Sequence, residues 1–319
     1  MTTGAAGRGA AVQGVAECLW RLGTLRRQTG CYVLMYHRIG RQGDPFPHVD
    51  VDAFHRQMRW VKDSCQVIAP PSLDAAGGVR WSMRPPVLVT FDDGGRDYAD
   101  LAYPVLRELN IPAIVFLVTD YVDRPRLFWW ERLHLAVTHA RMRRLFLPWL
   151  PAGGLDLEPT THDRVIAACE AHLKSLRDEL KERALDDIVS ALGDPDLPDV
   201  GRQTMTWDEV RSTMDCTTFG GHTHTHPLLS RIDDERLDDE IRVCRNRMTA
   251  ETGVAPTLFA YPNGDVTPAA KRLLPKHGFL RAFSTREGLA HQASDRLETP
   301  RTAVAGGLPT RRMIAPAWI

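Results

Sequence analysis

Two short stretches of the chain carry side chains that together could hold a metal ion. The first, TFDDGG, places Asp92 and Asp93 side by side after an apolar run. The second, GGHTHTHP, places His222, His224 and His226 at alternate positions. Carboxylate oxygen and imidazole nitrogen are both ligands that zinc and similar divalent ions accept. The stretches lie far apart in the sequence, so only the tertiary fold can bring them together.

The adjacent carboxylates of TFDDGG are costly to bury, because each charge costs several kcal/mol unless it is paired or bound to a cation. Successive side chains point in different directions. One acid can therefore bind a metal while the other faces a substrate, and the following glycines allow a tight turn. The alternative is an Asp-Gly turn with two solvated acids, and this stretch alone does not decide between them.

The spacing of the histidines leaves their geometry open. On a helical turn, His222 and His226 share one face at i and i+4, as in other zinc motifs. On an extended strand all three share one face. Pro227 disfavours a helical conformation at His226. Two histidines and one carboxylate with open positions suit a catalytic metal, which lowers the pKa of a bound water.

The elements that position these residues follow the pattern of a parallel α/β protein. Short apolar, β-branched runs alternate with helical patterns. The runs predict strands at 31–37, 86–91, 113–119, 217–221, 257–262 and 280–285. The helical patterns predict helices at about 52–63, 97–109, 206–214, 231–251 and 267–277, with Asp52 and Thr206 as N-caps and Pro268 in an opening turn.

The candidate residues all fall at the carboxyl ends of predicted strands, where parallel α/β folds build their sites. His37 ends the first strand, the two aspartates follow the second, and the histidines follow the fourth. A chain of 319 residues suits one α/β barrel or two small domains. We predict an N-terminal helical segment over 1–30 and a barrel over 31–319, interrupted at about 124–203 by a helical insertion without strand signals.

The amino-acid composition of the chain limits the classes of partner that we expect it to bind. Lys plus Arg and Asp plus Glu both number 40, so there is no basic excess that would indicate nucleic acid. Six scattered cysteines contain no CxxC pair, which argues against a thiolate metal site and is consistent with reduced thiols inside a cell. Polar residues interrupt the N-terminal apolar run, so we expect neither a signal peptide nor a membrane span.

The N-terminal segment has apolar residues at helical spacing with arginines alongside. It either packs on the surface of its own domain, which we favour, or lies on a membrane as an interfacial helix. The expected location is the cytoplasm, with membrane association through this helix as the alternative.

Three motifs in this order, TFDDG, GGHTHTHPLLS and FAYPNGD, resemble the signature of the polysaccharide deacetylase (NodB-homology) family of carbohydrate esterases. The resemblance spans about 31–122 and 205–304. It implies a distorted (β/α) barrel of about seven strands. It also implies a metal-dependent hydrolase that removes N-acetyl groups from an amino sugar in a polysaccharide, a lipid-linked glycan or another glycoconjugate.

The resemblance also implies roles for particular residues. Asp92 is expected to be the general base, while Asp93, His222 and His226 hold the metal. Zinc is the expected ion, with Co²⁺ or Ni²⁺ as alternatives. His224 lies at a variable position of the motif and is not expected to bind the metal. Thr223 matches a Ser/Thr whose hydroxyl steadies the turn, and we include it among the substrate-binding candidates.

FAYPNGD departs from the more widespread pattern, because Ala260 stands where an arginine normally orients the catalytic base. Arg301 is the candidate substitute, and the alternative is that Arg301 lies on the surface. Tyr261, Pro262 and Asn263 are predicted to contact substrate, and the backbone around Tyr261 and Asn263 could donate to an oxyanion.

The first predicted strand, VLMYHRIG, resembles that of a subgroup acting on poly-N-acetylglucosamine, in which a histidine from the N-terminal side is the general acid. That assigns proton donation to His37, whose type titrates near neutrality; the alternative is a structural histidine. Phe128, Trp129 and Trp130 in RPRLFWWERL either stack on sugar rings or anchor the inserted helices, which we favour.

Two other functions remain open. One is a related hydrolase of non-peptide C–N bonds that acts on another substrate, such as a formamido sugar. The other is a carbohydrate-binding relative that has lost catalysis. The complete set of two aspartates and two outer histidines argues against both a metal-free hydrolase and the binding protein.

Overall fold

The computed structural model describes residues 30–73 and 84–304. The predicted N-terminal helix lies outside these residues, so it and its membrane contact stay predictions. The five described cysteines form no disulfide with one another. Among the described residues, no helix has the length and apolar character to cross a membrane.

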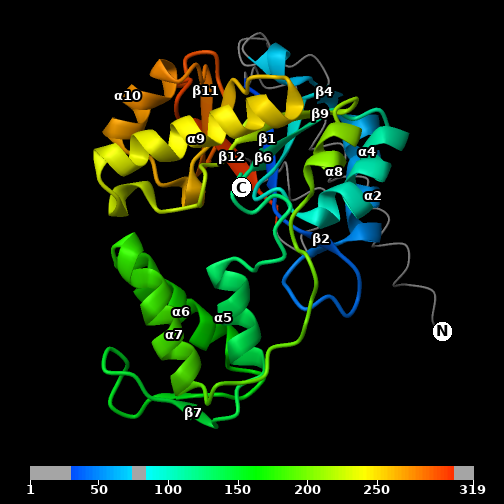
Figure 1. The fold of residues 1–319 in the computed structure, drawn as a ribbon. Helices are drawn as coiled ribbons and strands as arrows, with labels where there is room; N and C mark the ends of the chain where they lie inside the picture. The colour runs from blue at the N-terminus through cyan, green and yellow to red at the C-terminus, as the bar shows by residue number, and fades with distance from the viewer. Residues whose placement is uncertain (1–29, 74–83, 305–319) are drawn as a thin grey trace, which may run out of the picture.

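Seven parallel strands form a closed barrel, which confirms the predicted fold class (Figure 1). They follow one another in the order β1-β12-β11-β10-β9-β6-β5, and β5 pairs with β1 to close the ring. These strands are β1 (Tyr32–Tyr36), β5 (Pro86–Phe91), β6 (Ala113–Leu117), β9 (Thr217–Gly221), β10 (Leu258–Ala260), β11 (Arg281–Glu287) and β12 (Thr299–Ala303).

Strand β12 has no counterpart among the six strands that the apolar runs predicted. Its sequence, TPRTA, contains a proline and an arginine and lacks the β-branched apolar run on which those predictions relied. The strand nevertheless lies between β11 and β1, and four of its five residues are buried. A short strand, β4 (Gln66–Val67), also pairs with the start of β5. Another small pair joins β2 (Ile39–Gly40) to β3 (Val49–Asp50).

Helices cover the outside of the barrel close to the predicted positions. They are α2 (Val51–Ser64), α4 (Tyr103–Glu108), α8 (Trp207–Ser212), α9 (Asp234–Thr252) and α10 (Pro268–Lys276). A π-helical turn, η2 (Tyr98–Ala102), precedes α4, and 3-10 turns lie at η1 (Pro70–Ser72), η3 (Leu229–Arg231) and η4 (Pro262–Gly264). Thr206 caps α8 as predicted, but the prediction for Asp52 is wrong. The side chain of Asp50 accepts the two N–H groups at the start of α2.

Both faces of the barrel strands are buried, which explains their continuous apolar runs. In β1, Leu34 and Tyr36 pack outward against the helices, while Val33 points into the barrel with Phe116 and Phe283. Arg301 on β12 is completely buried as well. Because alternate residues of a strand point to opposite faces, one strand both anchors the helices and fills the barrel.

The predicted insertion between β6 and β9 contains three helices, α5 (Trp129–Thr138), α6 (His162–Ser175) and α7 (Asp178–Ala191). They share a hydrophobic cluster of their own and form a group beside the barrel (Figure 1). The prediction that this region has no strands is wrong, because β7 (Arg144–Leu145) and β8 (Leu155–Asp156) form an antiparallel pair. Two-residue strands are too short to show an alternating pattern.

Candidate active site

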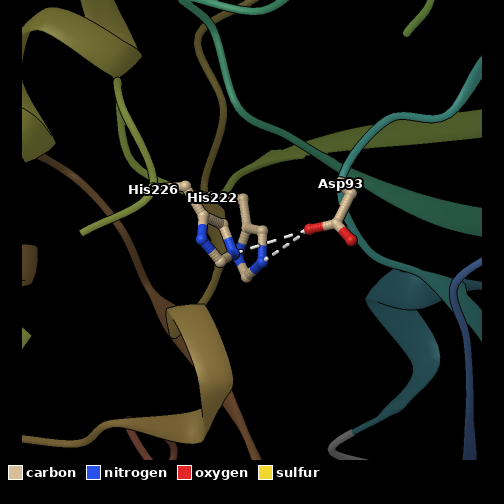
Figure 2. A group of neighbouring side chains, drawn as sticks. All are labelled: Asp93, His222 and His226. Carbon is tan, nitrogen blue, oxygen red and sulfur yellow. Dashed lines mark ion pairs between the residues drawn. The ribbon is translucent and has the colours of Figure 1, made fainter. Parts of the chain in front are cut away.

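Asp93, His222 and His226 converge on one point at the carboxyl end of the barrel strands, as Figure 2 shows. Their ligand atoms lie within 4.8 Å of one another. Oδ1 of Asp93 is 3.5 Å from Nε2 of His222 and 3.5 Å from Nε2 of His226. Within residues 30–73 and 84–304 this is the group of His, Cys, Asp and Glu side chains whose geometry could hold a metal ion.

A loop rather than a helix or strand brings the two histidines together. Asp93, Thr223 and His226 all have positive φ, at 71°, 65° and 64°. Such backbone costs of order 1–3 kcal/mol per residue and is enriched at functional sites. The Thr223 hydroxyl accepts the His226 N–H at 3.0 Å and donates to the His222 carbonyl at 2.5 Å. The turn therefore sets the angle between the two imidazoles.

The hydrogen bonds of His222 select the tautomer that a metal ligand needs. Its Nδ1 donates to the Ala260 carbonyl at 2.7 Å, so Nε2 carries the lone pair and faces Asp93. Burial lowers the pKa of His222, but Asp93 and Asp92 outweigh it and the net pKa is raised. A divalent cation at this point therefore competes with a proton for Nε2.

The other two groups hold charge states that suit a cation. Burial, with the His222 charge nearby, lowers the pKa of His226 to about 3, so its imidazole is neutral. Burial raises the pKa of Asp93, but its interaction with the neighbouring His222 outweighs burial and keeps the pKa below its usual value. One anionic oxygen and two imidazole nitrogens are a donor set that zinc accepts, so the residues present fit the ion.

His224, the middle histidine, points away from this group. Its Nδ1 lies 2.9 Å from the Thr119 hydroxyl, and its Nε2 lies 3.8 Å from Asp120. Alternate positions share a face only in an extended strand, and the turn at Thr223 removes that condition.

Asp92 forms a buried ion pair with Arg301. The two guanidinium nitrogens donate to the two carboxylate oxygens, each at 2.7 Å. Burial raises the pKa of Asp92, but the charge and hydrogen bonds of Arg301 outweigh it, so the pKa is lowered and the carboxylate is anionic at neutral pH. Arg301 also donates to the Ser284 carbonyl at 2.9 Å. The guanidinium beside Asp92 therefore comes from β12, while Ala260 contributes its carbonyl to His222.

His37 lies on the open side of Asp92. Its Nε2 is 3.9 Å from an Asp92 oxygen, and half of its side chain (51%) is exposed. It lines a cavity of about 190 Å³ together with both aspartates, His222 and His226. The half-exposed imidazole of His37 is accessible to a substrate, whereas the side chain of Asp92 is buried.

Of the four residues predicted to contact substrate, Asn263 alone lines this cavity. Thr223 is fully buried, with its hydroxyl engaged in the turn. Tyr261 is also fully buried; its hydroxyl donates to the Leu297 carbonyl and its N–H to the Phe283 carbonyl. Thr223, Tyr261 and the buried Pro262 therefore do not line this cavity, and their contact with a substrate stays a prediction. Sequence position could not separate these neighbours, because burial depends on β11 packing over the segment.

Glu240 on α9 is a site residue that the sequence analysis missed. Its buried carboxylate accepts the N–H groups of His224 and Thr225 at 2.8 and 2.7 Å, and the Thr225 hydroxyl at 2.6 Å. It thereby holds the histidine loop. The available signal was an acid in the apolar stripe of α9, three residues after Leu237 and next to Ile241, both of which are buried.

The aromatic residues of the insertion divide between the two predicted roles. Trp129 is buried in the insertion's own cluster, as an anchor would be. Phe128 stacks on Tyr121 on one side and on Trp130 on the other, with ring centroids 3.9 and 4.3 Å apart. Trp130 reaches the candidate metal site, with its ring centroid 4.7 Å from that of His226.

A sequence model described as polysaccharide deacetylase matches residues 82–282, which is more than half of the chain. The chain therefore belongs to the polysaccharide deacetylase family, and the family supports deacetylase activity. No curated protein is similar enough in sequence to count as a match.

Several solved structures share the fold. Deacetylase PplD from Streptococcus pyogenes, in complex with acetate, has a TM-score of 0.60 at 16% identity, covering 90% of this chain and 97% of its own. IcaB from Ammonifex degensii has a TM-score of 0.56 at 18% identity, covering 88% of this chain and 93% of its own. A de-N-acetylase from Aggregatibacter actinomycetemcomitans has a TM-score of 0.55 at 13% identity, covering 89% of this chain and 99% of its own. At these identities the likeness concerns the fold alone.

Proposed function

We propose that the chain is a divalent-metal-dependent hydrolase that removes the acetyl group from an N-acetylated amino sugar, with Zn²⁺ as the preferred ion. The observation that carries the proposal is the convergence of Asp93, His222 and His226 directly beside the Asp92–Arg301 ion pair. A three-residue ligand set leaves positions open for substrate and water, as catalytic sites require. When bound, the cation supplies a Lewis acid that polarises the amide carbonyl and acidifies water.

The protein's own residues account for the proton transfers. Asp92, anionic and aimed by Arg301, accepts a proton from the attacking water. His37, 3.9 Å away on the exposed side, donates a proton to the departing sugar nitrogen. The products are acetate and the free amine. Because Arg301 spans both oxygens of Asp92, the carboxylate cannot rotate away from the cavity.

Elemental analysis of purified protein tests the metal. We expect about one zinc per chain in the wild type, loss of the metal in His222→Ala and His226→Ala, and retention in His224→Ala, which is the matched control. A wild-type protein that neither contains nor takes up a divalent ion would overturn the metal-dependent reaction.

The rate of acetate release tests the role of Asp92 as the general base. The Asp92→Asn variant is expected to keep the metal and to lose about 10²–10⁴-fold in acetate release from an N-acetylglucosamine oligomer. Wild-type turnover by this variant would show that Asp92 is not the general base. If sugar binding persists in a wild type without turnover, the carbohydrate-binding alternative takes the place of the hydrolase.

A further inference from the structure

A second cavity of about 320 Å³ adjoins the first. The two cavities share His37, Asp93, Trp130 and Glu170 in their walls, so they form one continuous depression. One wall of the second cavity belongs to the barrel side, through Arg38 and the loop after β2. The opposite wall comes from α5 and α6 of the insertion. Its volume lies at the lower end of the roughly 300–1,000 Å³ typical of small-molecule sites.

Trp130 stands where the two cavities meet, and its orientation is held from behind. Phe128 lies parallel to the Trp130 ring at 10°, and Tyr121 lies parallel to Phe128 at 15°. Trp129 contacts the Trp130 ring edge-on at 89°. A large, rigid aromatic surface at the junction of two sugar-sized cavities suits the apolar face of a pyranose ring.

The charged groups of the second cavity are mostly paired with one another. Arg38 forms an ion pair with the buried Glu131, so neither charge is available to a ligand. Glu170 pairs with Lys174 at 2.7 Å. Asp163 is exposed and forms no ion pair with any residue of the described ranges.

The remaining ionisable groups add no fixed positive charge. Burial lowers the pKa of His134, and His37 stands at the mouth that leads to the metal site. Asp93, which also lines this cavity, faces His222 and His226, so the carboxylate of Asp163 is the charge left for a ligand. It attracts an ammonium group and repels a carboxylate or phosphate.

We propose that the second cavity is a subsite for the sugar that neighbours the residue being deacetylated, and that it prefers a neighbour with a free amine to one with a carboxylate. Trp130 is its stacking platform and Asp163 its charge-selecting residue. The inference rests on the proposed function. It makes the product of one deacetylation a favoured neighbour in the next, and it assigns the insertion to substrate selection.

Kinetics on disaccharides that differ only in the neighbouring sugar test this proposal. The probes are N-acetylglucosamine linked to glucosamine, to N-acetylglucosamine or to glucuronic acid, with methyl N-acetylglucosaminide as the single-sugar reference. We expect the wild type to prefer the amine-bearing to the acidic disaccharide by about tenfold or more in kcat/KM. Asp163→Asn should remove most of that preference. Asp187→Asn, an exposed acid on α7, is the charge-matched control and should retain it.

The Trp130 variants provide a second readout. Trp130→Ala should lower kcat/KM for the disaccharides more than for the single sugar, and Trp130→Phe should restore most of the difference. Equal kcat/KM for amine-bearing and acidic neighbours in the wild type would overturn the inference while leaving the deacetylase intact. If no probe releases acetate, the proposed function itself fails, and the two failures are thereby distinguished.

Discussion

Replacing Arg301 with methionine is the sharpest test of how the site is built. The guanidinium is completely buried and makes two 2.7 Å hydrogen bonds to Asp92, whose side chain is 3% exposed. Methionine fills similar space without charge and leaves Asp92 as an uncompensated buried carboxylate. Breaking a buried pair from one side costs about 3–5 kcal/mol. At about 2–4 °C per kcal/mol, the midpoint of thermal unfolding should fall by about 10 °C.

The matched control is Arg286→Met, on the neighbouring strand β11. Arg286 is mostly exposed, and its ion pair with Glu298 is 3.7 Å long. Exposed pairs contribute about 0–1 kcal/mol, so the midpoint should change by only a few degrees. Circular dichroism during heating measures both variants. Equal losses of stability in Arg301→Met and Arg286→Met would refute the reasoning.

A double variant separates the charge from the packing. Asp92→Asn combined with Arg301→Met leaves no buried charge, so it should be more stable than Arg301→Met alone. Additive losses would show that Arg301 stabilises the barrel through its other contacts, such as the 2.9 Å bond to Ser284. Arg301→Met should also lose acetate release by about 10²–10⁴-fold. Without the guanidinium, burial raises the pKa of Asp92 and a protonated carboxyl accepts no proton.

Three further predictions concern the surroundings of the site. Glu240→Ala leaves two loop N–H groups without their acceptor and should weaken zinc retention by about 10–100-fold in a chelator competition, whereas Glu240→Gln should retain most of it. Burial raises the pKa of Asp97 to about 6, above its unfolded value, so the folded state gains stability as pH falls from about 6 to 4. Asp97→Asn should therefore raise the free energy of unfolding at pH 7 by about 1–3 kcal/mol, an advantage that urea titrations at pH 4 should no longer show. Gly220→Ala places a Cβ 2.8 Å from the Leu258 carbonyl and should cost about 1–3 kcal/mol, while Gly153→Ala, which meets nothing within 4 Å, should change stability little in the same titrations.

Much of the barrel could be predicted from local patterns. A strand buried on both faces needs a continuous apolar run, so β1, β5 and β6 were visible in the sequence. Strand β12 was not, because Arg301 is buried by its ion pair inside the barrel rather than by apolar character. A charged side chain whose burial depends on a partner far away in the chain leaves no local pattern in the sequence.

The residue types of the group formed by Asp93, His222 and His226 were also readable from the sequence, because carboxylates and imidazoles are the ligands that zinc and similar ions accept. The sequence did not show which of the three histidines face Asp93. Positive φ at Asp93, Thr223 and His226 turns the outer histidines together and sends His224 to Asp120. The motif alone was compatible with a helix, a strand or this loop.

The sequence by itself determined six of the seven barrel strands, the chemistry of the motifs and the extent of the insertion, since each depends on residues close together in the chain. The tertiary structure decided which guanidinium meets Asp92, which acid holds the histidine loop, and that α5 and α6 form a wall of the cavity beside the metal group. Those contacts join segments far apart in the chain, and their geometry follows from the closure of the barrel and the packing of the inserted helices.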